Sequence, residues 1–259
     1  MARRSSKPSS LTAPFLKSLA FIEERVKPQE FPFSVPAFRG GKSELTFEQP
    51  VTIIVGENGT GKSTLLEGIA SQCGFNLSGG NRNHTYDGAH NMSPLGNALR
   101  LGWLPKVTRG FFLRAESFFS FGHYVDDVGA QEGYGGKSLH AQSHGESFMA
   151  WAESRFGYGR GIYILDEPEA ALSMQRQFEF LKIIRELELQ GESQFIIATH
   201  SPIMMAYPGA QLLLFDGKVV REVSLSETPH YRIMRDFMNN PAIMMERRFN
   251  DTPKDDEDL

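Results

Sequence analysis

The sequence has a single cysteine, no long apolar run and only a small excess of charge. Cys73, the one cysteine, excludes an internal disulfide framework and is typical of a reducing compartment. No run of 18 apolar residues occurs, and the N-terminus lacks the apolar core of a signal peptide, so we expect a cytoplasmic protein without direct membrane insertion. A net charge of −4 over 259 residues argues against a broadly basic nucleic-acid-binding surface, although it leaves room for a local basic patch.

What the sequence does contain is a glycine-rich stretch, GENGTGKST, at 56–64. It has the spacing of a P-loop, and it lies between an apolar β-branched run at 51–55 and apolar residues at helical spacing. Backbone N–H groups of such a turn surround phosphate oxygens, and the helix N-terminus adds positive potential. The predicted nucleotide-binding residues are Gly56, Asn58, Gly59, Thr60, Gly61, Lys62, Ser63 and Thr64.

Three other apolar segments also end in polar side chains, at 110–116, 162–167 and 195–200. The carboxyl ends of parallel strands share one edge of a sheet, and ligands bind at that edge. We therefore expect five side chains to meet around one nucleotide. They are Lys62, Glu116, Asp166, Glu167 and His200.

The apolar strand that ends in Asp166 and Glu167 has the Walker B pattern. We expect Asp166 to hold Mg²⁺ directly or through water, together with the Ser63 hydroxyl, and Glu167 to polarise the attacking water. Lys62 would reach the β- and γ-phosphates. Glu116 is predicted as a further Mg²⁺ ligand through water, and its alternative role is a salt bridge with Arg114 or another arginine.

These motifs together resemble the ABC-type ATPase superfamily. The order GENGTGKST, FFLRAES, QSHGES, YILDEPEAALS and FIIATHSP is similar to that of small stand-alone bacterial ATPases related to SMC and RecF-type proteins, over roughly residues 30–240. The resemblance implies an α/β fold of the P-loop NTPase type, with a mixed sheet, flanking helices, a small antiparallel β-lobe and a small signature-bearing lobe. It also implies ATP and Mg²⁺ as cofactors and catalytic roles for Lys62, Glu167 and His200.

The superfamily's signature sequence opens the helix that leads into Walker B. Residues 77–80 have the letters LSGG, but they follow the P-loop helix instead. Ser143, Gly145 and Glu146 stand at the expected place, Ser143 being 23 residues before Asp166. The resemblance implies that these three residues bind the ATP of an opposite protomer, so that two chains enclose two nucleotides in an ATP-dependent homodimer.

Apolar patterns predict the elements near the N-terminus. The mixed spacing over 15–26 favours a short helix, and two prolines within 31–38 reduce that alternating segment to an edge strand. With a second short strand at 45–47, the edge strand would form the β-lobe. Residues 74–100 have no clear period and are expected to form a loop.

Further along, a helix is predicted over about 173–189, a hairpin around Asp216-Gly217, and a last helix at 230–238. The apolar face of the first of these helices is expected to carry Phe178, Leu181, Ile184 and Leu187. We expect one ATPase domain over 15–245, with the signature-bearing lobe at about 117–157. The Ser/Pro-rich residues 1–14 and the acidic residues 246–259 are expected to be disordered.

Several functions are compatible with these motifs. The leading one is ATP hydrolysis that drives a conformational change in an unknown partner, either DNA or a protein of a repair or defence system. A transporter's nucleotide-binding subunit is an alternative, although Glu116 and the glycine-rich stretch 122–142 argue against it. A slow ATP-locked switch is a second alternative, and a small-molecule kinase is disfavoured because no lid arginines are evident. Phe33 and Phe38 are candidates to stack on adenine, or else packing residues.

Overall fold

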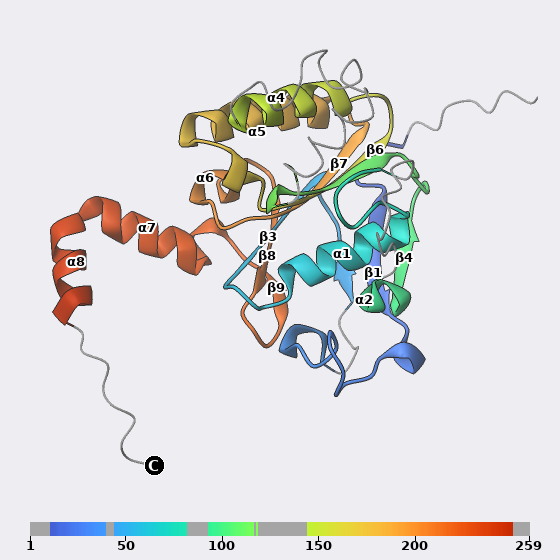
Figure 1. The fold of residues 1–259 in the computed structure, drawn as a ribbon, viewed down its shortest axis with the longest axis horizontal. Coiled ribbons are helices and arrows are strands. Elements are labelled where there is room, and N and C mark those ends of the chain that lie inside the picture. The colour runs from blue at the N-terminus through green and yellow to red at the C-terminus, as the bar shows by residue number, and fades with distance from the viewer. Residues whose placement is uncertain (1–10, 40–43, 82–92, 117, 119–143, 251–259) are drawn as a thin grey trace, which may run out of the picture.

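The computed structural model describes residues 11–39, 44–81, 93–116, 118 and 144–250. They form a six-stranded main sheet with helices on both faces, and a three-stranded antiparallel sheet beside it (Figure 1). The strands are β1 (Leu16–Phe21), β2 (Leu45–Thr46), β3 (Val51–Gly56), β4 (Leu99–Trp103), β5 (Gly110–Arg114), β6 (Gly161–Asp166), β7 (Ser193–Ala198), β8 (Gln211–Phe215) and β9 (Val220–Glu222). The helices are α1 (Lys62–Cys73), α2 (Pro94–Asn97), α4 (His144–Arg155), α5 (Met174–Leu189), α6 (Pro202–Met205), α7 (Pro229–Asn239) and α8 (Pro241–Asn250).

The main sheet has the order β5-β6-β7-β3-β8-β9, with β3 in its interior. Strand β3 pairs in parallel with β7 and β8, and β5, β6 and β7 also run parallel. Among the described strands of this sheet, β9 at the edge is the one that pairs antiparallel, through the hairpin predicted around Asp216-Gly217. The predicted mixed α/β fold is confirmed, and the carboxyl ends of its parallel strands share one edge.

The main sheet has a core on each face because successive side chains of a strand point to opposite faces of the sheet. Ile53 belongs to the core beneath α4 and α5, whereas Ile54 belongs to the core beneath α1. Figure 1 shows α4 and α5 on one face and α1 on the other. The first core is aromatic: the Trp151 ring lies 5.0 Å from that of Phe111 and 5.5 Å from that of Phe148.

The small sheet has the order β2-β1-β4 and corrects the prediction for the N-terminal segments. Residues 16–21 form strand β1 instead of a helix, because Leu19 pairs with Leu45 of β2 and with Leu101 of β4. Pairing with a distant strand outweighs a mixed local period. Strand β4 and helix α2 likewise begin within 74–100, the segment expected to be a loop.

The segment 31–38 is not an edge strand. It consists of turns followed by a 3-10 helix at Pro36–Phe38, with Pro36 in its first turn. Proline fits that position because an N–H in the first turn of a helix would have no partner within the helix. Phe33 and Phe38 are buried there, whereas Phe31 is 71% exposed.

The buried face of helix α5 differs from the predicted one in its first aromatic residue. Ile184 and Leu187 are buried as expected, but Phe178 is 58% exposed and Phe180 takes its place in the core. Residues 180, 184 and 187 follow the spacing of a helical stripe, to which 178 does not belong. Leu181 packs against the rim of the same core.

The ends of the domain differ from the prediction. Ala13 is buried and its N–H donates to the Gly191 carbonyl at 2.9 Å, so the ordered chain begins before residue 15. At the other end, Pro241 is the first residue of helix α8, a position at which proline is common. Residues 246–250, expected to be disordered, are therefore helical. Residues 1–10 and 251–259 lie outside the described part.

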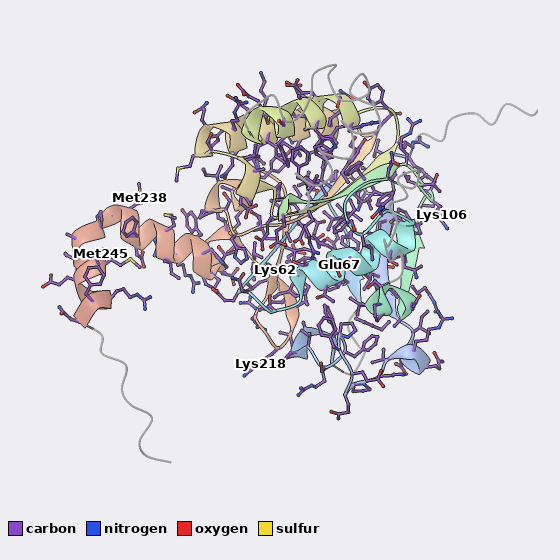
Figure 2. The ribbon with its side chains drawn as sticks, viewed as in Figure 1. Lys62, Glu67, Lys106, Lys218, Met238 and Met245 are labelled. Atoms are coloured by element: carbon purple, nitrogen blue, oxygen red, sulfur yellow. The ribbon has the colours of Figure 1, made fainter. Side chains whose placement is uncertain are left out.

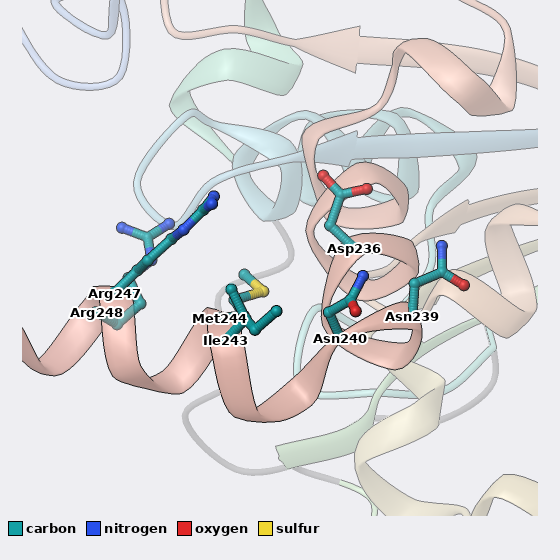
Figure 3. Close-up of a pocket in the computed structure, with 7 residues that line it drawn as sticks. All are labelled: Asp236, Asn239, Asn240, Ile243, Met244, Arg247 and Arg248. Carbon is teal, nitrogen blue, oxygen red and sulfur yellow. The ribbon is translucent and has the colours of Figure 1, made fainter.

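Helices α7 and α8 extend away from the body of the domain (Figure 1), and Met238 and Met245 mark them in Figure 2. Where the two helices meet, they form a groove (Figure 3). It is lined by Asp236, Asn239, Asn240, Ile243, Met244, Arg247 and Arg248. No described helix of the chain is both long and apolar enough to cross a membrane.

Candidate functional site

The glycine-rich turn joins the end of β3 to the start of α1. A side chain at Gly56 would overlap the carbonyl oxygen of Phe215, and Gly61 has φ +103° with the Phe38 ring against it. Both positions therefore require glycine. The Thr60 hydroxyl donates to the Glu57 carbonyl at 2.8 Å and holds the turn closed. A cavity of about 190 Å³ lies over this turn, lined by Phe31, Val35, Asn58, Gly59, Gly61, Lys62, Ser63, Thr64 and Glu167.

Lys62 opens helix α1, and Figure 2 shows it near the middle of the domain. Its side chain is buried, and Nζ donates to the carbonyl oxygens of Gly56 at 2.8 Å and Glu57 at 3.0 Å. Burial lowers the pKa of Lys62, while the carboxylates of Glu167 and Asp166 favour its charged form. The ammonium is thus held at the turn in a position suited to phosphate oxygens.

Asp166 ends strand β6 and is buried between two donors. Ser63 Oγ donates to Asp166 Oδ1 at 3.1 Å, and Arg114 Nε donates to Oδ2 at 3.3 Å. Arg114 also pairs with Glu67, at 2.6 Å. Burial raises the pKa of Asp166, and the charge of Arg114 with the Ser63 hydrogen bond opposes that rise. Arg114, the last residue of β5, was predicted only as a possible salt-bridge partner of Glu116, and its contact with Asp166 was not predicted.

The oxygen atoms at this edge fit magnesium. Ser63 Oγ and Asp166 Oδ1 are hard ligands held together, and Glu116 lines the same small cavity of about 50 Å³. Mg²⁺ is commonly held by one or two carboxylates plus the phosphates of a substrate. Among the described residues, no cluster of three or more His, Cys, Asp or Glu side chains could hold a metal by itself.

We expect Arg114→Met to destabilise the protein by about 1–3 kcal/mol at pH 7, because it leaves the buried Asp166 carboxylate without its cation. The pKa of Asp166 would then lie further above its unfolded value. The deficit should be full above that pKa and should shrink as the pH falls through it and the carboxyl protonates. Urea unfolding at pH 7 and in mild acid measures this, with Arg235→Met on the exposed face of α7 as the control. A deficit that does not change with pH would contradict the assignment.

Glu167 directly follows β6 in a left-handed backbone conformation, with φ 50° and ψ 50°. Side chains other than glycine adopt it rarely, and such positions concentrate at functional sites. The Glu167 N–H donates to the Ala198 carbonyl at 2.9 Å, which ties the turn to β7. Its side chain is 41% exposed, and Oε1 lies 3.5 Å from His200 Nε2.

His200 follows β7 and is anchored from two sides. Its backbone N–H donates to Glu169 Oε1 at 2.6 Å, and its Nδ1 lies 3.0 Å from Nε2 of His230. Burial lowers the pKa of His200, and Lys62 lowers it further, so the ring is neutral near pH 7. Glu169 and His230 were not predicted. Glu169 could have been suspected from its place just after Walker B, whereas nothing in the sequence links His230 to His200.

The two predicted signature residues within the described part, Gly145 and Glu146, lie on a different helix from the P-loop lysine. Gly145 and Glu146 lie in the first turn of α4, and Glu146 Oε1 is 3.7 Å from Arg176 of α5. Neither lines the two cavities described above. Ser143 lies outside the described residues. The LSGG letters at 77–80 do not open a helix: Gly80 instead makes a β-bridge with Phe112.

A glycine turn after a central strand, an acidic pair after β6 and a histidine after β7 thus lie at one edge of the main sheet. Two family models match the chain: an AAA domain over residues 35–99, and "AAA domain, putative AbiEii toxin, Type IV TA system" over residues 139–206. The first contains the glycine turn, and the second contains Asp166, Glu167 and His200. The chain carries a P-loop ATPase domain of the AAA/ABC type, which confirms the resemblance at that level.

Individual proteins are similar at greater distance. The translation initiation factor rli1 of Schizosaccharomyces pombe is 24% identical over 179 residues, and RLI1 of Chaetomium thermophilum is 23% identical over 182. Each match covers 66% of this chain, and the chain spans little more than a quarter of those proteins (27% and 28%). Among solved structures, the SMC head domain of Thermotoga maritima has 18% identity and a TM-score of 0.47, with 81% of this chain and 99% of that one covered. CbiO1 of Clostridium perfringens has 18% identity and a TM-score of 0.48, with 90% and 99% covered.

Proposed function

We propose that this chain binds ATP with Mg²⁺ and hydrolyses its terminal phosphoanhydride bond. The observation that carries the proposal is the convergence of five side chains at one edge of the sheet. Lys62 and Ser63 come from the start of α1, Asp166 and Glu167 from the end of β6, and His200 from the end of β7. The two cavities at this edge share Ser63 and Glu167.

Each side chain has a distinct task in the reaction. Glu167 orients a water molecule and accepts its proton as the water oxygen bonds to the γ-phosphorus. The bond from that phosphorus to the bridging oxygen breaks, and ADP leaves with the electron pair. Lys62 and the N–H of His200 donate hydrogen bonds to the γ-phosphate oxygens as charge moves onto them. Ser63 and Asp166 would hold Mg²⁺, which neutralises phosphate charge when it is bound.

A homodimer with ATP between its protomers is the second part of the proposal. It is supported by the position of Gly145 and Glu146, which open α4 next to Arg176 and do not line this chain's own nucleotide cavities. If they bind nucleotide, that nucleotide belongs to another copy. The conformational change on hydrolysis would act on a partner protein or on DNA.

The test is phosphate release from ATP and Mg²⁺ by the purified full chain. Steady release that stops on chelation of Mg²⁺ supports hydrolysis. Tight ATP binding without turnover would support the ATP-locked switch instead. The absence of both binding and turnover would overturn the proposal.

We also infer that Phe31, not Phe33 or Phe38, stacks on the base of the nucleotide. Phe31 is exposed and lines the cavity over the P-loop, whereas Phe33 and Phe38 are buried in the core. Stacking of a base on an aromatic ring is worth about 1–3 kcal/mol. Phe31→Ala should therefore weaken ATP binding about 5- to 150-fold in a calorimetric titration and leave the free energy of unfolding nearly unchanged.

The matched control is Phe33→Ala, which removes a buried ring from the same segment. It should cost about 3–5 kcal/mol of stability. Unchanged ATP affinity in Phe31→Ala would place the base elsewhere.

A further inference from the structure

Two histidine rings meet beside the candidate catalytic glutamate. His200 Nδ1 and His230 Nε2 are 3.0 Å apart, with the ring centroids 5.1 Å apart and the planes inclined by 58°. His230 comes from the first turn of α7, whose start is fixed by the Thr228 side chain accepting from the Tyr231 N–H. Its side chain is only 15% exposed, although the rest of α7 points largely into solvent.

Only one proton can lie between these two nitrogens. Burial lowers the pKa of both histidines, so each neutral ring carries one N–H. In one arrangement His230 Nε2–H donates to His200 Nδ1, and the proton of His200 then lies on Nε2. In the other, His200 Nδ1–H donates to His230, and His200 Nε2 presents a lone pair.

The carboxylates around the pair favour the first arrangement. Glu167 Oε1 lies 3.5 Å from His200 Nε2, and Glu57 Oε1 lies 3.9 Å from His230 Nε2. Each carboxylate attracts an N–H and repels a lone pair. Lys62, the remaining charged group that acts on both rings, does not reverse this preference because its ammonium is directed to the carbonyls of the P-loop.

The Nε2 atom of His200 is positioned as a hydrogen-bond donor without an acceptor in the described part of the chain. Among the described residues, His200 Nε2 is buried and has no hydrogen-bond partner within the chain. A buried donor without a partner is costly unless something else accepts from it. A phosphate oxygen bound beside Glu167, which lines the cavity over the P-loop and lies 3.5 Å from His200 Nε2, would be such an acceptor.

We propose that His230 is a positioning residue that fixes the tautomer of His200, so that His200 presents an N–H and not a lone pair to the terminal phosphate. This inference rests on the proposed ATP hydrolysis. It assigns α7 a role in the site, although His230 lies 30 residues after His200 in the sequence. His230 does not touch the substrate, and it acts only through His200.

The experiment compares His230→Gln, whose side-chain amide still donates, with His230→Leu, which does not. With saturating Mg²⁺, His230→Leu should lower kcat about 10- to 100-fold with KM for ATP within about twofold, because an oriented donor to the transition state is lost. His230→Gln should stay within about threefold of the wild type. Ile233→Gln, at an exposed position of α7, controls for damage to the helix.

Nitrogen NMR of histidine-labelled full chain reads the tautomer directly, with His200→Gln assigning the signal. We expect the Nε2–H form of His200 in the wild type and in His230→Gln, and a mixture of tautomers in His230→Leu. An Nδ1–H form in the wild type, or equal kcat in the Gln and Leu variants, would overturn the inference. The spectra need no turnover, so they decide the tautomer even if the wild type fails to hydrolyse ATP and the proposed function falls.

Discussion

Lys62→Met should weaken ATP binding about 10- to 100-fold and lower kcat about 100- to 1,000-fold. The reason is the position of Nζ, which is buried at the P-loop with the carbonyls of Gly56 and Glu57 as its partners. When ATP binds, phosphate oxygens would replace those carbonyls as acceptors of the hydrogen bonds from the Lys62 ammonium. Methionine keeps a stem of similar length in the buried channel and removes only the charge and its donors.

The same substitution should not unfold the protein. Burial of the ammonium opposes its charge, as the lowered pKa of Lys62 indicates, so an apolar side chain removes a cost as well as two hydrogen bonds. Calorimetric ATP titration and steady-state phosphate release measure the loss, and thermal unfolding checks the fold. Lys182→Met on α5, where the side chain is 79% exposed, is the matched control and should behave as wild type. ATP hydrolysis by Lys62→Met within twofold of the wild-type rate would contradict the proposed site.

The parts of the site that the sequence predicted are those encoded locally. Strands β3, β6 and β7 are mostly apolar and buried along their whole length because both faces of a central parallel sheet are covered, and the polar residues that end them necessarily reach the shared edge. The P-loop is equally local, since its glycines are demanded by the turn itself. These features required no knowledge of how distant segments pair.

What the sequence could not reveal depends on contacts between distant segments. Strand β1 exists because Leu19 pairs with Leu101, a partner 82 positions away, and its own pattern fits a helix as well. The burial of Phe180 instead of Phe178 is not of this kind, because the spacing of residues 180, 184 and 187 already indicates it. His230 lies beside His200 because the first turn of α7 packs there, and no sequence motif indicates this.

Glu167→Gln should separate binding from chemistry and thereby test the proposed dimer. The amide can still accept a hydrogen bond from water but cannot take its proton, so kcat should fall about 100- to 10,000-fold while ATP affinity remains. Glutamine has the same shape, so the left-handed backbone at this position carries no new strain. Glu186→Gln on the exposed surface of α5 is the control for the loss of one charge.

With hydrolysis blocked, ATP should hold two copies together long enough to be observed. Light scattering of Glu167→Gln should give 29.0 kDa without nucleotide and about twice that mass with ATP and Mg²⁺. Adding Gly145→Leu should prevent the shift, because a bulky side chain at the start of α4 would displace the side chain of Arg176, which lies 2.8 Å from the position of the new Cβ, and block the approach of the other copy's nucleotide. A monomer at every ATP concentration would exclude the homodimer but not hydrolysis, and a dimer without ATP would indicate an interface elsewhere. Since Gly145 lies outside this chain's own nucleotide cavities, the double variant should still bind ATP, and this retained binding distinguishes a lost interface from a damaged site.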